Sequence, residues 1–166
     1  MVFPTTLRRS IIALNGVHGP DYYQAGDANM YPGMIVAYDD SDEVKICTYA
    51  LKPIGVVGCD ADHDLSTVYA LGERIPIWLL GCGVDLYVKC SDSSTVERDD
   101  IIEMSDNTTL DGLGQRKVDY IVLTTANADT AGTERNMTTW FYIGRALEAG
   151  ALTTAVSRYI PVKLSL

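Results

Sequence analysis

The sequence predicts an all-β protein: a small β-barrel or sandwich of about eight to ten short strands, with one or two short helical turns and an N-terminal extension. Three observations lead to this prediction. Short runs alternate apolar and polar residues, glycines and acidic turns separate these runs, and no segment carries a helical apolar stripe over three turns. At 166 residues, the chain has the length of one ordinary domain.

Residues 1–30 differ from the rest and predict an N-terminal arm or extension ahead of a β-barrel domain at residues 31–166. Turn signals follow one another from Gly16 to Asp27. Before them, Ser10–Leu14 is the one segment with the pattern of a short strand. A segment with so little periodicity is expected either to lie over the barrel or to reach a neighbouring molecule.

From Met34 onward the pattern is strand, turn, strand. Met34–Tyr38 is apolar and precedes an acidic turn at residues 39–42. Glu43–Tyr49 then alternates polar and apolar residues, which is typical of a half-buried strand. Ile54–Gly58 is a short β-branched run bounded by glycine, and it predicts the next strand.

The middle of the chain predicts a hairpin. Arg74–Leu80 and Val84–Lys89 have strand patterns, and Gly81–Gly83 between them is a compact turn signal. Further strands are expected at Ile101–Met104, Val118–Thr124, Met137–Ile143 and Tyr159–Leu166.

The last predicted strand contains Pro161, which suits a strand end or edge because proline donates no ladder hydrogen bond. We expect this strand to pair with an early one and to seal the barrel. Helical turns are expected at Gly144–Ala151 and Ser94–Glu97, and no period of about 20–50 residues repeats along the chain.

Charge and hydropathy exclude two classes of partner. Acidic residues outnumber basic ones 22 to 13, giving a net charge of −9, whereas nucleic-acid binding needs clustered Lys and Arg. No apolar run approaches the roughly 20 residues of a membrane helix. The four cysteines form no CxxC pair, so free thiols are favoured over a zinc site, and a disulfide is left open.

The sequence offers no catalytic constellation, and we predict no catalytic residue, metal or cofactor. The available imidazoles are His18 and His63, both in turn-like segments. Asp60–Asp64 begins like a calcium loop, but Leu65 and Leu71 occupy the positions that need Gly and Glu. A solvated acidic turn is therefore favoured, and a weak divalent-ion site is left open.

The order of several short motifs resembles the small β-barrel capsid decoration (head-stabilising, or cement) proteins of tailed bacteriophages and related viruses. The resemblance covers residues 31–166. The motifs are a Pro-Gly opening at 32–36, Pro-Ile-Gly-Val-Val at 53–57, Gly-Glu-Arg-Ile-Pro-Ile at 72–77, Ile-Gly-Arg-Ala-Leu-Glu at 143–148 and Ile-Pro-Val-Lys-Leu at 160–164.

The resemblance implies a non-enzymatic virion protein. Such a protein is made in the host cytoplasm, forms a homotrimer and binds the major capsid protein on the outer surface of the assembled head. It stabilises the shell against the pressure of the packaged genome through many weak contacts that act together.

The N-terminal residues supply the predicted contact site. We expect residues 2–14 to form an arm that touches the capsid or a neighbouring subunit, with Phe3 and Leu7 as apolar anchors. Arg8 and Arg9 would pair with acidic groups of the shell. An arm folded back on its own barrel is the alternative.

Two other functions are compatible with the sequence. One is a tail, baseplate or other surface-layer component with the same barrel. The other is a small hydrolase with an Asp/His site near residues 60–64, for which substitutions at Asp62 and His63 would be decisive.

Overall fold

The computed structural model describes residues 19–39, 42–48, 51–90, 96–104, 112–116, 142–149 and 158–164. Within these ranges the protein is all-β, as the sequence predicts, with ten strands and no helix. A helix long and apolar enough to cross a membrane is thus not found among the described residues.

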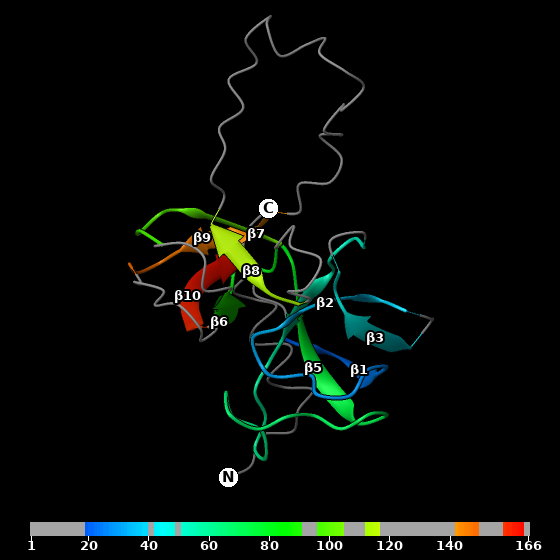
Figure 1. The fold of residues 1–166 in the computed structure, drawn as a ribbon. Helices are drawn as coiled ribbons and strands as arrows, with labels where there is room; N and C mark the ends of the chain where they lie inside the picture. Colours follow the sequence, from blue (N-terminus) through cyan, green and yellow to red (C-terminus); the bar gives the residue numbers. More distant parts are fainter. Residues whose placement is uncertain are drawn as a thin grey trace, which may run out of the picture.

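The strands follow one another along the chain with turns between them (Figure 1). They are β1 (Asp21–Ala25), β2 (Ile35–Tyr38), β3 (Glu43–Ile46), β4 (Gly55–Val57), β5 (Arg74–Leu79), β6 (Asp85–Cys90), β7 (Ile101–Met104), β8 (Gly114–Arg116), β9 (Tyr142–Ala146) and β10 (Arg158–Leu164).

The strands close into two separate barrels, where a single barrel or sandwich was expected. The first barrel has the strand order β1-β3-β2-β4-β5, and the second has β10-β6-β8-β7-β9. In Figure 1 the first barrel lies on the right and the second on the left. A closed barrel leaves no strand edge free to pair with another chain.

The two barrels have the same topology in the same chain order. In the first, β1 runs parallel to β3, and the pairs β2–β3, β2–β4, β4–β5 and β1–β5 are antiparallel. In the second, β6 runs parallel to β8, and β7–β8, β7–β9, β9–β10 and β6–β10 are antiparallel. Strands β6–β10 therefore correspond, one by one, to β1–β5.

The correspondence extends to individual residues, because the register is the same. Gly55 of β4 lies opposite Val36 and Leu79, and Gly144 of β9 lies opposite Ile102 and Leu164. From these anchors the remaining registers match around both barrels, apart from a bulge between Ile102 and Glu103 where β7 pairs with β9. Identical residues occupy equivalent positions in the pairs Tyr22/Tyr87, Ile35/Ile101, Ile54/Ile143, Gly55/Gly144, Ile75/Ile160, Pro76/Pro161 and Leu79/Leu164.

A proline, Pro76, occurs inside β5, and Pro161 lies inside β10, whereas a strand end or edge was expected for Pro161. The Pro76 carbonyl accepts a hydrogen bond from Gly58 N at 2.8 Å, and the Pro161 carbonyl accepts one from Leu147 N at 2.8 Å. Since N and C=O of one strand residue point to the same side, each proline directs its missing N–H past the end of β4 or β9. Pro76 therefore makes no return hydrogen bond to Gly58 O, which accepts from the Tyr69 hydroxyl instead at 3.0 Å.

Inward-facing β-branched residues fill both barrels. The first core contains Val36, Val44, Val57, Ile75 and Ile77, all at most 2% exposed. The second core is larger, because it includes residues on the outer surface of β2 and β4 as well as the interior of the second barrel. Its main members are Ile35, Ala37, Val56, Val88, Ile102, Ile143, Ile160, Val162 and Leu164.

Backbone hydrogen bonds join the barrels beside this shared core. Lys89 N donates to Gly33 O, and Ile35 N donates to Gly112 O, each at 2.8 Å. Gly33 and Gly112 both have positive φ, and a Cβ atom on either would lie within 3.0 Å of an atom of the other barrel. Glycine at these positions therefore lets the two barrels approach closely.

The hairpin predicted at Gly81–Gly83 is wrong. Strand β5 pairs with β1 and β4, whereas β6 pairs with β10 and β8. The turn connects the two barrels instead of two paired strands. Similarly, the last strand closes the second barrel by pairing with β6 and β9, where pairing with an early strand was expected.

Two other expectations change. Strand β1 lies ahead of residue 31, so the barrel region includes residues 21–30, which we had assigned to the N-terminal extension. Gly144–Ala146 belongs to β9, because it pairs with β7 and β10, and it does not begin a helical turn. The strands predicted at Ser10–Leu14 and Val118–Thr124 lie outside the described residues.

Candidate interaction surface

Large apolar side chains are exposed on the outside of the barrels. Tyr22 on β1 is 44% exposed, Tyr38 at the end of β2 is 50% exposed, and Tyr87 on β6 is 54% exposed. Leu71, in the turn before β5, is 66% exposed. Tyrosine is enriched among residues that dominate protein–protein binding energy, because it combines a rigid apolar ring with a polar hydroxyl group.

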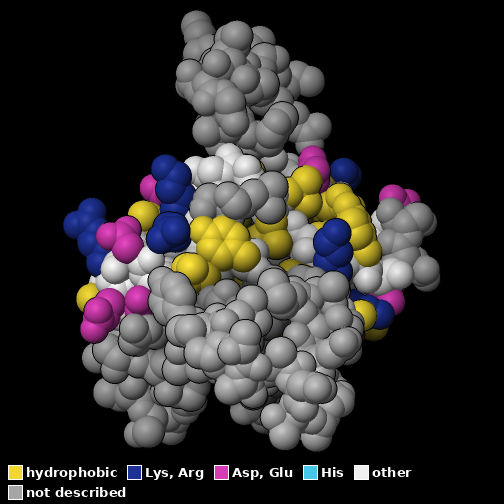
Figure 2. Space-filling model, turned by 90° about the horizontal axis from the view of Figure 1, so that it is seen from above, with side chains coloured by type: hydrophobic (Ala, Val, Ile, Leu, Met, Phe, Trp, Pro, Cys, Tyr) yellow, Lys and Arg dark blue, Asp and Glu magenta, His cyan; other side chains and the backbone are white. Residues whose placement is uncertain are grey.

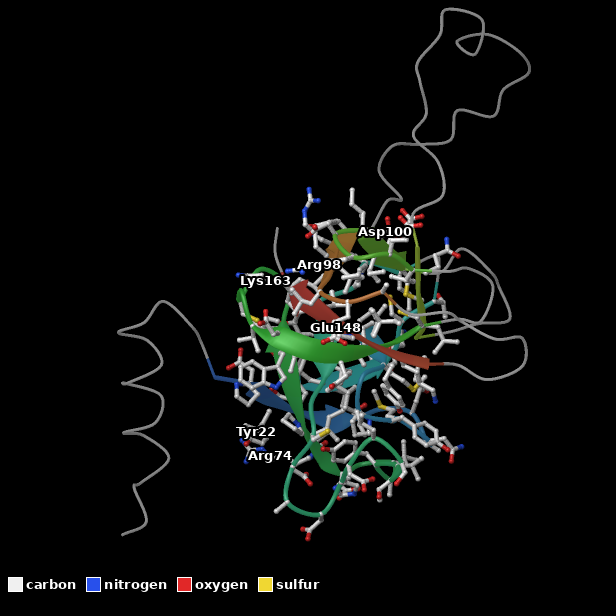
Figure 3. All side chains as sticks on the ribbon, turned by 90° about the vertical axis from the view of Figure 1, so that its left-hand side faces the viewer. Tyr22, Arg74, Arg98, Asp100, Glu148 and Lys163 are labelled. Atoms are coloured by element: carbon white, nitrogen blue, oxygen red, sulfur yellow. The ribbon has the colours of Figure 1, made fainter. Side chains whose placement is uncertain are left out.

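Tyr22 lies beside a basic side chain. The Arg74 guanidinium is 5.5 Å from the centre of the Tyr22 ring, within the range of a cation–π contact. Figure 3 shows the two side chains next to each other, away from the core. Strands β1 and β5 bring them together, since Gln24 lies opposite Arg74 and Tyr22 lies opposite Pro76. The contact holds the ring in place on an exposed surface.

A second pair of tyrosines lies at one end of the first barrel. The rings of Tyr23 and Tyr38 meet edge to face at 5.6 Å, and their hydroxyl oxygens are 3.0 Å apart. The hydrogen bond to Tyr38, burial, and the nearby Asp21 and Asp42 carboxylates together raise the pKa of Tyr23 to about 12. The Tyr23 phenol therefore stays neutral at physiological pH.

Tyr87 occupies in the second barrel the position that Tyr22 occupies in the first. It lies opposite Pro161, as Tyr22 lies opposite Pro76. Lys163, two residues beyond Pro161 on the same outer face, is exposed. Its cross-strand partner is Asp85. Each barrel thus presents an exposed tyrosine with a proline directly across from it.

The turn at residues 58–73 contains the acidic cluster seen in the sequence. Asp64 accepts hydrogen bonds from the Ser66 hydroxyl at 2.6 Å, the Ser66 amide at 2.8 Å and the Thr67 hydroxyl at 3.0 Å. These bonds lower the pKa of Asp64 to about 2. Burial alone would raise the pKa of Asp60, but hydrogen bonds from Asp62 N and from His63 lower it. Both carboxylates therefore accept hydrogen bonds from within the turn and stabilise its conformation.

His63 is held between two carboxylates. Its Nδ1 is 2.9 Å from Asp60 Oδ1 and its Nε2 is 3.3 Å from Glu73 Oε1, while its ring stacks on Tyr69 at 4.0 Å. A general base needs a ring nitrogen that faces its substrate, and here each ring nitrogen faces a carboxylate. The arrangement suits a structural role, in which His63 links the start of the turn to its end.

Two tyrosine hydroxyls hold this turn in place, one from within the turn and one from the second barrel. Tyr69 is fully buried and donates to Gly58 O at 3.0 Å. Tyr159, from β10 of the second barrel, donates to Leu65 O at 2.6 Å. Burial raises the pKa of Tyr159 to about 12, so its hydroxyl stays protonated and able to donate.

Metal-binding and thiol chemistry were also considered. Within the described ranges, no three His, Cys, Asp or Glu side chains are grouped so as to hold a metal ion. All four cysteines lie within the described ranges and none forms a disulfide: Cys47 and Cys90 are buried, Cys82 is partly buried and Cys59 is exposed. Burial raises the pKa of Cys90 to about 12, so this thiol behaves as a small apolar side chain.

The predicted contact residues Phe3, Leu7, Arg8 and Arg9 lie outside the described residues. The structure instead draws attention to Tyr22, Arg74 and Tyr87, which sequence reasoning did not select. Tyr22 and Tyr23 are identical neighbours, so the sequence does not show which ring points outward and which lies at the end of the barrel. That difference depends on the strand register. The recurrence of Tyr opposite Pro was the available signal, but it requires the cross-strand pairing to be known.

The face seen from above in Figure 2 carries hydrophobic side chains at its centre, with Lys/Arg and Asp/Glu side chains intermixed around them. This face therefore does not present charge of a single sign. No protein-family model matches the chain, and no curated protein is found to be similar to it.

Proposed function

We propose that the chain is a non-enzymatic virion structural protein that binds the outside of an assembled capsid and stabilises it as a decoration (cement) protein. Its partners are the major capsid protein and further copies of itself, arranged as a homotrimer. The order of motifs over residues 31–166 supports this proposal, and so does an all-β fold of closed barrels.

The observation that carries the proposal is the combination of filled barrels and exposed tyrosines. Val, Ile and Leu side chains occupy the inward positions of both barrels. Small barrels filled in this way serve as rigid scaffolds, so recognition falls to the outer surface. There, Tyr22, Tyr38 and Tyr87 provide rigid anchors of the kind found at protein–protein contacts.

The mechanism that follows is adhesion by many small contacts. A decoration protein binds each shell subunit weakly, but contacts at several points around one particle act together, which raises retention by orders of magnitude. Closed barrels suit this role because they add surface area without exposing strand edges that would pair with other chains.

The test is binding of the purified protein to empty, undecorated heads assembled from the major capsid protein of the same virus. Co-sedimentation with heads should saturate, and decorated heads should resist heat or osmotic shock better than bare ones. Absence of binding would overturn the proposal. Deleting residues 1–14 then tests the arm, since unchanged occupancy would remove its role.

The runner-up is a tail, baseplate or other surface-layer component that uses the same exposed residues. Electron microscopy of virions labelled through an antibody to this chain separates the two. Label distributed over the head supports decoration, and label confined to the tail supports the alternative.

A further inference from the structure

The ring of His63 has a carboxylate at each of its two nitrogens. Nδ1 is 2.9 Å from Asp60 Oδ1, and Nε2 is 3.3 Å from Glu73 Oε1. A neutral imidazole carries one N–H and can donate only one of these hydrogen bonds, whereas an imidazolium carries two and can donate both. The two acceptors therefore match the charged form of the side chain. Histidine is the residue type that changes charge between about pH 5 and pH 8.

The titratable groups packed around His63 keep one charge state over this range. Burial raises the pKa of Asp60, but hydrogen bonds from the turn outweigh it and lower the pKa. Burial raises the pKa of Tyr69, whose ring stacks on the imidazole at 4.0 Å, and that of the Cys59 thiol beside Asp60. Burial also raises the pKa of Tyr159, which reaches the turn from the second barrel, to about 12. The charge of the site therefore changes at His63.

Loss of one proton breaks the contact to Glu73 and keeps the one to Asp60. Asp60 Oδ1 is closer to the ring and is fixed by two backbone amides, Asp62 N at 2.9 Å and His63 N at 2.8 Å. The neutral ring therefore keeps its proton on Nδ1, and the Nε2 lone pair then faces and repels the Glu73 carboxylate. Glu73 Oε2 accepts a hydrogen bond from Ala70 N at 2.8 Å, so displacement of Glu73 weakens that bond as well.

We propose that His63 is a pH-sensitive switch: its charged form holds the turn at residues 58–73 in its observed conformation, and its neutral form releases Glu73 and loosens the turn. The stabilising contact is present at low pH and is lost as the pH rises. Tyr159 donates to Leu65 O at 2.6 Å, two residues from His63, so the switch lies beside the bond that holds the turn against the second barrel. It operates whether or not the chain decorates a capsid.

The experiment measures hydrogen exchange of single backbone amides by NMR between about pH 5.5 and pH 8, with each rate expressed relative to the unfolded chain at the same pH. Protection of the Ala70 amide, whose acceptor is Glu73, should fall about threefold to tenfold as the pH rises, the effect of losing one charged hydrogen bond at a partly exposed site. Gly72 N donates to Ala25 O at 2.7 Å, and its protection should not change because that bond does not involve His63.

Two variants test the two partners. His63→Gln is neutral at every pH, so its Ala70 protection should be independent of pH, and His18→Gln, at the other histidine of the chain, is the matched control and should behave like the wild type. Glu73→Gln should reverse the dependence. Its amide oxygen can accept from Ala70 N while its NH2 group donates to the neutral Nε2, so the turn becomes more protected as the pH rises.

Asp62→Asn is the matched control for Glu73→Gln, because it removes one negative charge from an exposed position of the same turn, and it should keep the wild-type dependence. Ala70 protection that is constant with pH in the wild type, or that still falls in His63→Gln, would overturn the proposal. A fall in Glu73→Gln like that of the wild type would overturn it too. If His63→Gln does not fold, the sign of the change in Glu73→Gln decides alone.

Discussion

At the residue scale, two glycines show how closely the strands pack. Gly55 has extended backbone, so its need for glycine is one of space: an added Cβ would lie 2.5 Å from Trp78 O and 2.7 Å from an Ile77 methyl carbon. An added Cβ on Gly144 would likewise lie too close to Lys163 O and to a methyl carbon of Val162. Backbone atoms of a paired strand cannot move aside without breaking the ladder.

Gly55→Ala and Gly144→Ala should therefore each lower the free energy of unfolding by about 1–3 kcal/mol, the usual cost of overpacking. Urea denaturation measures the change. Gly72→Ala is the contrasting variant, because Gly72 has open space around it but a φ of +78°. Asn tolerates that conformation, so Gly72→Asn should recover stability, whereas Gly55→Asn should be at least as harmful as Gly55→Ala.

Asp64 makes the acidic turn sensitive to low pH. Its pKa in the folded protein is lowered from 3.8 to about 2 by hydrogen bonds from Ser66 and Thr67. A lowered pKa means that the carboxylate stabilises the folded state above the unfolded pKa. This contribution is lost as the pH falls from about 4 to about 2.

We expect Asp64→Asn to melt at a lower temperature than the wild type at pH 6 and at the same temperature near pH 2. Asparagine keeps an acceptor oxygen but has no charge, so it mimics the protonated acid. Thermal melts between pH 2 and pH 6 provide the measurement. A difference in melting temperature that does not change with pH would contradict this explanation.

At the element scale, the strands were predictable but their partners were not. The strand predicted at Glu43–Tyr49 contains β3, and the one predicted at Val84–Lys89 overlaps β6. Such patterns are properties of neighbouring residues, so they can be read from the sequence. The Gly81–Gly83 turn has the composition of a hairpin, yet β5 already has β1 and β4 on its two sides. Local residues do not determine which distant strand pairs, and β8, with three residues, is too short for any alternation to be seen.

The turn at residues 58–73 has no regular secondary structure. Tyr159, on β10 of the second barrel, holds it by a hydrogen bond. Removing the Tyr159 hydroxyl breaks its hydrogen bond to Leu65 O. Tyr159→Phe should cost about 1 kcal/mol of stability and should speed hydrogen exchange of the amides at residues 59–68. Tyr87→Phe, at an exposed ring, is the control and should leave both unchanged. Unaltered exchange in Tyr159→Phe would show that the turn holds its position without the second barrel.

At the scale of the whole molecule, the correspondence between the two barrels was hidden from sequence reasoning. The offset between equivalent residues changes along the chain and differs between the pairs Tyr22/Tyr87, Gly55/Gly144 and Pro76/Pro161. Connections of unequal length remove any fixed period. Identity is limited to a few positions, such as Ile-Gly at β4 and β9 and Ile-Pro within β5 and β10. The register of the strands reveals what a search for periodicity cannot.

The shared core indicates that the two barrels unfold together. Ile35 is fully buried on the outer surface of the first barrel, where it packs in the cluster that fills the second barrel, and its N–H donates to Gly112 O. Ile75, also fully buried, belongs to the interior of the first barrel alone. Truncating a buried Ile to Ala costs about 2–5 kcal/mol.

Ile35→Ala and Ile75→Ala should each lower the unfolding midpoint of the entire protein in a single transition. Far-UV circular dichroism reports on the strands of both barrels, and tryptophan fluorescence includes Trp78, which packs against the shared core. Coincident urea curves from the two probes indicate one cooperative unit. If Ile75→Ala instead separated the curves, with the first barrel melting before the second, the barrels would be independent and the contact between them too weak to couple their folding.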